Sequence, residues 1–423
     1  MSDLFIGTAK LSITPKPEML PLPQKFHTKY TEVHDDIFVR VLLLENNNNK
    51  YIFVEFDLFG VPDTADLKAM IAEELSICSE NIILFDSYNH CSPRQDIDTF
   101  AIDHCSNAEV NTKKYFEFCI TETLSAVRQA GNKMVKGRIG VGAGKSYANV
   151  YREVKIGDIW SEDVDFEGPS DKELLLLRFE DMNGNPLAFL MNYTLYGNMA
   201  YIVREAGSDD ITISGDIPGM TQRFLEQSFD DSVIVLWASG AAGDQNPLVM
   251  GSVPVFHPDG SRSSAILAPA PAYLYCSSLA GRIAADALMI NQNIYIEKEA
   301  AEISAAEIIT VLPGQTFHDE KDQPQKAAGP DINLRLQALR IGNILLYAVS
   351  CAPGSALGTR LKEDSPYKYT FLITHAGENS GYIADDLGCM RKTINYYRMK
   401  IHEGDAEPAL RSGLRKLMDI LNQ

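Results

Sequence analysis

The chain has 423 residues, 45% of them hydrophobic, which is enough to bury one large core or two moderate ones. Its formal net charge of −19 at pH 7 argues against nucleic acids and anionic membrane surfaces as main partners. No window approaches about 20 uninterrupted apolar residues, so we expect no transmembrane segment.

The first residues, MSDLFIGTAKLSITP, contain neither a basic segment nor a long apolar stretch, so we expect no signal peptide. The seven cysteines are odd in number, scattered along the chain and never paired as CxxC. This pattern is typical of free thiols in a reducing compartment rather than of a disulfide framework. We therefore expect a cytoplasmic protein.

Short apolar runs alternate with longer helical patterns from the beginning of the chain. Residues 37–45 and 51–60 flank an asparagine-rich segment and predict a β-hairpin. Residues 63–75 combine an acidic start with apolar positions at helical spacing, and residues 81–85 predict a buried strand. A second helix is predicted for 111–131, closed by a glycine. The alternation predicts an α/β or mixed α+β fold, with central mixed β-sheets and surrounding helices.

The second half of the chain continues this alternation. Residues 174–195 and 334–350 predict two further hairpins. Residues 218–229 predict a helix with proline in its first turn, and 232–240 predict a core strand. Three stretches rich in Gly, Pro, Asp and Ser predict long loops: 145–170, 250–268 and 313–330. Because no internal repeat or clear linker divides the sequence, we expect a single domain over residues 1–423.

Four apolar runs end in polar or glycine-containing loops, at residues 86–93, 192–199, 239–247 and 350–355. Ligands of open α/β sheets bind beyond strand ends, where such loops converge. If the four loops meet in space, they form a pocket for a small-molecule ligand.

The glycine-rich segment GVGAGKS, residues 140–146, resembles a phosphate-binding loop at first sight. The Walker pattern requires four residues between its first glycine and the Gly-Lys pair, and Ile139 stands where that glycine is needed. No extended core strand precedes the segment, and a poor helix former follows it. We interpret it as a strand edge followed by a loop.

His90 lies in the first of the four loops, within SYNHCSP. Its imidazole could serve as a metal ligand, a general base or a polar residue at a strand end. None of the eight histidines forms HxH, HExxH or HxxxH with another, so a zinc site would need ligands from distant segments. The neighbouring Cys91 is a conceivable nucleophile, but adjacent residues on a strand point in different directions, which favours a buried, inert thiol.

Two further segments carry candidate catalytic residues. In GAAGDQNP, residues 240–247, the small residues allow a ligand close to the backbone, whose amides could hold an anion or an oxyanion. The alternative is a tight turn capped by Asp244. In ISGDIPG, Asp216 either caps the following helix or directs its carboxylate into the pocket.

Taken together, these motifs resemble the neutral/alkaline, non-lysosomal ceramidase family. IGTAKLSITP, NHCSP, ISGDIPG, GAAGDQNP, AVSCAPGS and GYI occur in the family's order over nearly the whole chain. The resemblance implies the fold of the catalytic domain without the C-terminal immunoglobulin-like domain of characterised members. It also implies a hydrolase of the amide bond of N-acyl sphingosine, in which zinc activates water and a serine-containing loop stabilises the tetrahedral intermediate.

The residues that the resemblance aligns with the zinc ligands differ from those of the family. Tyr88 takes the place of the first histidine of the family's T-H-T-H-S-G-P run, and His90 matches the second histidine. Tyr196 takes the place of another histidine ligand, and Ser355 that of the glutamate ligand. Only the tyrosine ligand is kept, as Tyr382. Since a free phenol has a pKa of about 10, tyrosines in place of imidazoles must lose protons before they bind zinc.

The active-site serine of the family aligns with Asn246. From these substitutions we expect no cofactor, with zinc as the alternative, and a pocket lined by Tyr88, Tyr196, Ser355 and Tyr382. One hypothesis is an amide or ester hydrolase with His90 as base and Asp216 or Asp244 nearby. The other is a non-catalytic small-molecule-binding protein, a pseudoenzyme, on the same scaffold. A third reading is that the tyrosines simply fill the pocket.

Overall fold

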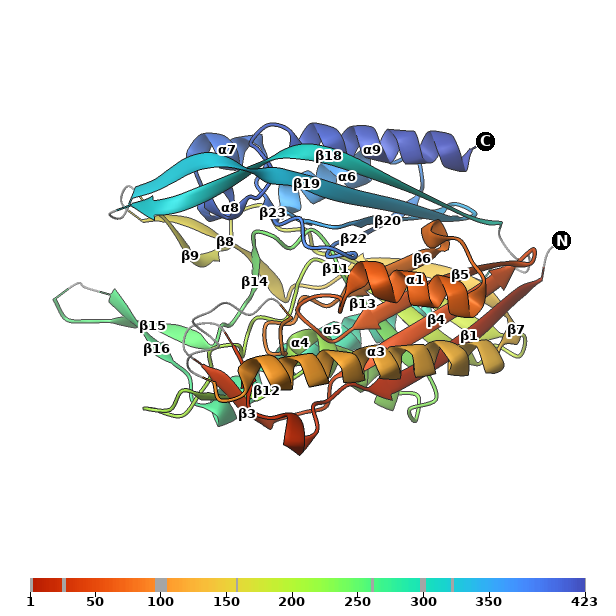
Figure 1. The fold of residues 1–423 in the computed structure, drawn as a ribbon, viewed down its shortest axis with the longest axis horizontal. Coiled ribbons are helices and arrows are strands. Elements are labelled where there is room, and N and C mark those ends of the chain that lie inside the picture. Colours follow the sequence, from red (N-terminus) through yellow and green to blue (C-terminus); the bar gives the residue numbers. More distant parts are fainter. Residues whose placement is uncertain are drawn as a thin grey trace.

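Two β-sheets lie face to face in the middle of the molecule, and helices cover the outer face of each (Figure 1). The computed structural model describes residues 3–24, 28–95, 105–156, 159–259, 262–296, 302–320 and 323–422. The layers follow the order helix, sheet, sheet, helix. This arrangement is the predicted α/β class, with central mixed sheets and surrounding helices.

The larger sheet has nine strands within the described residues, in the order β13-β11-β10-β7-β1-β4-β5-β6, with β17 paired to β7. It is mixed, because β11 pairs with β13 and β5 with β6 in parallel while its other neighbours are antiparallel. Its strands are β1 (Leu4–Ser12), β4 (Phe38–Asn46), β5 (Asn49–Phe56), β6 (Ile82–Asp86), β7 (Val135–Lys145), β10 (Glu173–Asp181), β11 (Pro186–Tyr193), β13 (Ile234–Ser239) and β17 (Tyr295–Ile296).

The predicted hairpins of the larger sheet are confirmed. Asn47 and Asn48 connect β4 to β5 with φ angles of 52° and 64°, the left-handed conformation that a two-residue hairpin turn requires. The glycine-rich segment that superficially resembles a phosphate loop forms most of β7. A Cβ atom at Gly142 or Gly144 would lie 2.6–2.7 Å from the side chain of Ile290, so these glycines let a helix pack closely on the strand.

The smaller sheet has the strand order β18-β19-β20-β22. Its strands are β18 (Ile303–Glu320), β19 (Gln323–Ile341), β20 (Ile344–Val349) and β22 (Tyr369–Ile373). Leu339, Leu346 and Phe371 from this sheet pack against Leu42 and Leu177 from the larger one, and all five side chains are buried. The burial of apolar side chains on both facing surfaces holds the two sheets together.

The helices complete the two outer layers. Helices α1 (Thr64–Leu75) and α3 (Ala108–Asn132) cover one part of the larger sheet, and α4 (Asp216–Gln227) and α5 (Pro269–Gln292) cover the other. Helices α6 (Ser355–Glu363) and α9 (Ala406–Leu421) cover the smaller sheet. In the described part of the chain, none of the helices combines the length and apolar character needed to span a bilayer.

The prediction of three long loops is wrong. Residues 145–170 contain the hairpin of β8 (Asn149–Ile156) and β9 (Ile159–Asp165), 250–268 contain β15 (Ser252–Phe256) and β16 (Arg262–Ile266), and 313–330 belong to the β18–β19 hairpin. Residues 157–158, 260–261 and 321–322 of these stretches lie outside the described residues. Three of the buried residues of β8 are polar (Asn149, Arg152 and Glu153), and the described residues of the other two hairpins are mostly half-buried or exposed, so these sequences lack the apolar alternation of a half-buried strand. In the last of them, a register shift after Leu312 accommodates the glycine and proline residues.

Candidate functional site

The four loops that follow β6, β11, β13 and β20 meet at one end of the sheets. The backbone N–H of His90 donates to the carbonyl of Gly197 at 2.6 Å, which joins the first loop to the second. The N–H of Gly240 donates to Tyr193 at 2.8 Å, and that of Gly243 donates to Pro353 at 3.0 Å. Segments that lie far apart in the sequence therefore share one corner of the molecule.

A cavity of about 390 Å³ opens at this corner, bordered by aromatic side chains of the converging loops. The ring of Tyr88 lies 5.1 Å from that of His90, 5.3 Å from that of Tyr196 and 6.3 Å from that of Tyr382, measured between centroids. These four residues were predicted to lie together, and the structure brings them together. Tyr88 and Tyr196 belong to one buried cluster, with Tyr382 packed against it, and the cavity lies beside this cluster.

The backbone at Tyr88 is unusual for an aromatic residue. Its φ angle is 51°, in the left-handed region that non-glycine residues seldom adopt. The carboxylate of Asp86, at the end of β6, accepts a hydrogen bond from the Tyr88 N–H at 2.8 Å and supports this turn. Backbone strain of this kind concentrates at functional sites, where surrounding structure holds it in place.

A buried guanidinium group lies against the phenols. Arg152, on β8, donates hydrogen bonds to the Tyr196 hydroxyl and to the carbonyl of Gly243, the latter at 2.6 Å. Its guanidinium carbon lies 5.8 Å from the Tyr196 ring centroid and 5.5 Å from that of Tyr382, within the range of cation–π attraction. The glycine-rich loop of residues 240–247 thus binds a cation through a backbone carbonyl, whereas the sequence analysis offers its backbone amides as a site for an anion.

Further basic side chains border the same cavity. Arg94 lies over the Phe59 ring, and Arg398 and Lys400 are exposed at the rim. Glu162, on β9, lies 3.5 Å from Arg152 and 3.4 Å from Arg398, and it is the one carboxylate among the described residues that border this cavity. Among the described residues, the border of this cavity therefore carries more positive than negative side chains.

His90 is held in its neutral form. Burial and the positive charges of Arg94 and Arg152 lower the pKa of its imidazole well below the ordinary value near 6.5. Its Nε2 atom is shielded from solvent and has no hydrogen-bond partner within the described part of the chain. A neutral imidazole with a free lone pair at a cavity wall can accept a proton.

The sequence analysis did not single out a buried histidine next to His90's neighbour Tyr88, namely His375. Its ring stacks on that of Tyr88 with 3.7 Å between centroids, and burial lowers its pKa to about 3. The sequence contained only a weak indication of its role, a single histidine shortly after the apolar residues of β22. Arg152 was missed because the segment that carries it was interpreted as a loop.

The three phenols differ in acidity. Burial raises the pKa of Tyr88 and of Tyr196 well above the ordinary value for tyrosine. Burial also disfavours the phenolate of Tyr382, but the positive charges of Arg152 and Arg398 outweigh this effect and lower its pKa. Tyr382 is thus the most acidic phenol of the site.

Asp216 lies behind the site rather than in the cavity wall. Its carboxylate accepts hydrogen bonds from the Cys91 thiol at 3.0 Å and from the Ala200 N–H at 2.9 Å. Burial raises the pKa of Asp216, and burial together with Asp216 raises the pKa of the Cys91 thiol. These contacts tie two of the four loops together, and they leave Cys91 protonated and buried.

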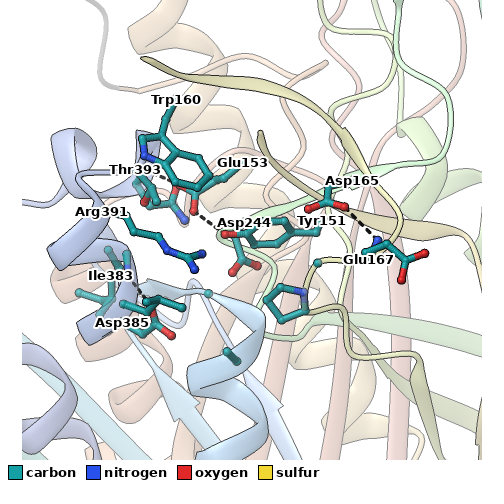
Figure 2. A pocket seen from close by; sticks show the side chains of 18 residues that line it. Tyr151, Glu153, Trp160, Asp165, Glu167, Asp244, Ile383, Asp385, Arg391 and Thr393 are labelled. Carbon is teal, nitrogen blue, oxygen red and sulfur yellow. Dashed lines mark hydrogen bonds between the residues drawn. The ribbon is translucent and has the colours of Figure 1, made fainter. Parts of the chain in front are cut away.

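Asp244 and Ser355 also lie outside the cavity. The Asp244 carboxylate accepts a hydrogen bond from the Ser355 N–H at 2.8 Å, and burial raises its pKa to about 7. The Ser355 hydroxyl accepts from the Asp171 N–H at 2.7 Å. Asp244 borders a separate pocket of about 300 Å³, where Figure 2 shows it beside Tyr151, with Arg391 reaching in from α7 (Asp386–Arg391).

Asn246 is buried one step behind the cavity wall. Its side-chain oxygen accepts a hydrogen bond at 3.1 Å from Asn198, which does border the cavity. Across the residues that the structure describes, no cluster of three or more His, Cys, Asp or Glu side chains is arranged to hold a metal ion.

Known structures share this fold. One is described as the crystal structure of neutral ceramidase from Pseudomonas aeruginosa, with a TM-score of 0.70 at 15% sequence identity over 100% of this chain and 74% of that chain. Another is a ceramidase complexed with C2, with a TM-score of 0.71 at 14% identity over 100% of this chain and 75% of that one. No protein-family model and no curated protein sequence matches the chain. The architecture is therefore that of the neutral ceramidases.

Proposed function

We propose that the protein is a ceramidase-like hydrolase of small-molecule amides that does not use the zinc ligands of that family. The observation that carries this proposal is the environment of His90. Its imidazole is neutral, its Nε2 has no partner among the described residues, and it borders a cavity that Arg152 also borders. A proton acceptor beside a fixed cation is the minimum that hydrolysis of an amide requires.

The residues at the expected ligand positions do not fit a zinc ion. Tyr88 and Tyr196 would have to lose their protons to bind the metal, but burial raises the pKa of both phenols. The Tyr196 oxygen already accepts a hydrogen bond from Arg152, whose positive charge opposes a second cation beside it. Ser355 donates no anionic oxygen, and its hydroxyl is bonded to Asp171. We therefore derive no step through a metal.

In the proposed reaction, the His90 imidazole accepts a proton from water, and the resulting hydroxide equivalent attacks the amide carbonyl carbon. The carbonyl oxygen becomes negatively charged in the tetrahedral intermediate. Arg152 supplies a buried positive charge for that oxygen, which is worth more in a low-dielectric site than in water. The protonated His90 then returns its proton to the leaving amine as the C–N bond breaks.

The low pKa of His90 also supports a second candidate, a non-catalytic binding protein on the same fold. A base whose pKa is strongly lowered stays unprotonated but accepts protons weakly. Arg152 in addition already donates hydrogen bonds to Tyr196 and to the carbonyl of Gly243, so fewer of its N–H groups remain to stabilise a tetrahedral intermediate. Binding without turnover would be the expected behaviour if these effects dominate.

The test is an assay of purified protein on a panel of N-acyl amides, with and without a metal chelator. We expect slow hydrolysis that the chelator leaves unchanged and that His90→Gln reduces at least about 100-fold, the usual contribution of a general base. His257→Gln is the matched control, because His257 is exposed and bonded to Ser263 in a peripheral hairpin. Loss of activity on chelation, or equal activity in His90→Gln, would exclude the proposed chemistry.

Absence of turnover across the panel would favour the binding protein. Elemental analysis of untreated protein then adds an independent readout. Stoichiometric zinc in that sample would contradict both candidates, because each rests on the misfit between zinc and the phenol-rich donor set.

A further inference from the structure

The charge of the cavity is opposite to that of the molecule. The protein carries a formal net charge of −19, yet four basic side chains and one carboxylate border the His90 cavity among the described residues. The basic residues come from separate segments: Arg94 follows β6, Arg152 lies on β8, and Arg398 and Lys400 lie at the end of α8 (Ile394–Arg398) and just beyond it. Such a concentration of positive charge in an acidic protein attracts anions.

Polar atoms without partners gather at the same cavity. Three residues of its border, Arg152, His90 and Asn198, each have a polar atom that is shielded from solvent and has no hydrogen-bond partner within the part of the chain described: Nε, Nε2 and Oδ1. Arg152 and Asn198 are themselves almost fully buried, at 2% and 3% exposure. Buried polar groups normally have partners, so this cluster indicates a polar ligand or ordered solvent in the cavity.

The basic side chains that border the cavity differ in burial. Arg152 is buried against Tyr196 and Tyr382, whereas Arg398 and Lys400 are exposed at the opening. A second hollow of about 560 Å³ shares Arg94 and Lys400 with the cavity, so the two spaces adjoin. Asp63, Asp66 and Glu378 border the second hollow, so the excess of positive charge lies on the side of the His90 cavity.

We infer that the His90 cavity takes acyl amides whose amine part carries an anionic group, a carboxylate or a phosphate. This inference rests on the proposed function for the amide bond, which lies at His90. The anionic group pairs with Arg398 and Lys400 at the opening. Guanidinium and ammonium groups bind both anions through charge-assisted hydrogen bonds, so the cavity selects for the charge.

Glu162 opposes this selection. It is bonded to both Arg152 and Arg398, and an incoming anion must compete with its carboxylate for Arg398. The pKa of Glu162 is lowered, because the charges of the two arginines outweigh the effect of its burial, so the carboxylate is ionised at neutral pH. Replacing it with a neutral isostere should therefore strengthen anion binding, an effect that damage to the fold cannot imitate.

Calorimetric titration with three probes of equal acyl length tests the inference: N-hexanoylglycine, N-hexanoyl phosphoethanolamine and the neutral N-hexanoylethanolamine. We expect at least one anionic probe to bind about tenfold more tightly than the neutral one. The anionic probe that binds more tightly identifies the headgroup. Arg398→Ala and Lys400→Ala should each weaken its binding about tenfold, and Glu162→Gln should tighten it about fivefold.

Arg391→Ala is the matched control, since Arg391 is exposed on the nearby helix α7 and borders the other pocket. It should leave the affinity unchanged. Equal or tighter binding of the neutral probe, no binding of any probe, or weaker anion binding in Glu162→Gln would overturn the inference. Anion-selective binding without hydrolysis would retain the inference and reject the proposed reaction, so the two can fail separately.

Discussion

Two histidines contact the Tyr88 ring. Tyr88 stacks on His375 and meets the His90 ring edge-on, with interplanar angles of 16° and 85°. His375 is buried and His90 is half-buried, and neither Nε2 atom has a partner within the described residues. Burial disfavours the protonated form of each ring, so both remain neutral well below the pH at which a free imidazole titrates.

The titration of His90 can be measured without any assay of function. We expect its imidazole resonance to keep the shift of the neutral form from pH 8 to pH 5.5, because burial and the nearby arginines lower its pKa well below 6.5. NMR spectra recorded over this range provide the measurement, and His90→Gln assigns the signal. A midpoint near 6.5 would show that the ring is solvated and that the described environment is wrong.

His375 should make the stability of the protein depend on pH. Its pKa is about 3 in the folded state and about 6.5 in the unfolded chain, so its contribution is fully present above pH 6.5 and is lost as the pH falls toward 3. Between pH 8 and pH 5 the free energy of unfolding should fall by about 2 kcal/mol on account of this residue. In His375→Phe, which keeps an aromatic ring on Tyr88, the fall should be smaller by that amount. Denaturant titrations at both pH values test this, and an unchanged fall would refute it.

At the scale of elements, the β8–β9 hairpin and the glycine-rich loop after β13 build the site together. The hairpin carries Arg152 and Glu162, and the loop accepts the guanidinium through the carbonyl of Gly243. The loop packs tightly on β21 (Ala352–Pro353): a Cβ atom at Gly243 would lie 2.5 Å from the carbonyl oxygen of Ala352. Backbone cannot yield as a flexible side chain does, so only glycine fits there.

Gly243→Ala should therefore destabilise the protein and disturb the cavity. The added methyl group meets backbone oxygen, and overpacking of this kind costs about 1–3 kcal/mol. Gly60→Ala serves as control, because its Cβ would meet no atom within 4 Å, and we expect a change within about 0.5 kcal/mol. Thermal and denaturant unfolding of both variants provide the comparison. Equal stabilities would mean that the loop does not pack on β21 as described.

At the scale of the whole molecule, the site depends on how the two sheets pack. The loops after β6, β11 and β13 come from the larger sheet, and the loop after β20 comes from the smaller one. Tyr382 begins the short strand β23 (Tyr382–Ile383), which pairs with β21 beyond β20. The relative position of the sheets thus sets the distance between Tyr382 and Tyr88.

Leu346→Ala tests the contribution of the intersheet core. Leu346 is fully buried between the sheets, and removing three of its carbons should cost about 2–5 kcal/mol of unfolding free energy. Leu274→Ala, a matched truncation at a position 67% exposed on α5, should change it by less than about 0.5 kcal/mol. Equilibrium unfolding of the two variants tests this contrast. Similar losses in both would contradict face-to-face packing of the sheets.

The sequence by itself determined the element types and the fold class where one face of an element is buried. Strands such as β4, β5 and β10 and helices such as α3 and α4 were predicted because burial imposes a regular apolar period on the residues. Strands that bury polar side chains, as β8 does, or that are half-buried or exposed, as in the far part of β18–β19, carry no such apolar period, so the sequence predicted loops there. The loops expected to converge do so, because the apolar runs before them end at the same side of the sheets.

Only the tertiary structure decided the character of the site. The structure brings together four residues as the resemblance implied: Tyr88, His90, Tyr196 and Tyr382. Three other candidates lie outside the cavity and form hydrogen bonds with the backbone there: Asp216, Asp244 and Ser355. The charge of the cavity comes from arginines whose positions in the sequence follow no shared pattern. These arginines lie close together because distant segments of the chain pack against each other. A local sequence pattern shows which residues are neighbours along the chain, but it does not show which residues are neighbours in space.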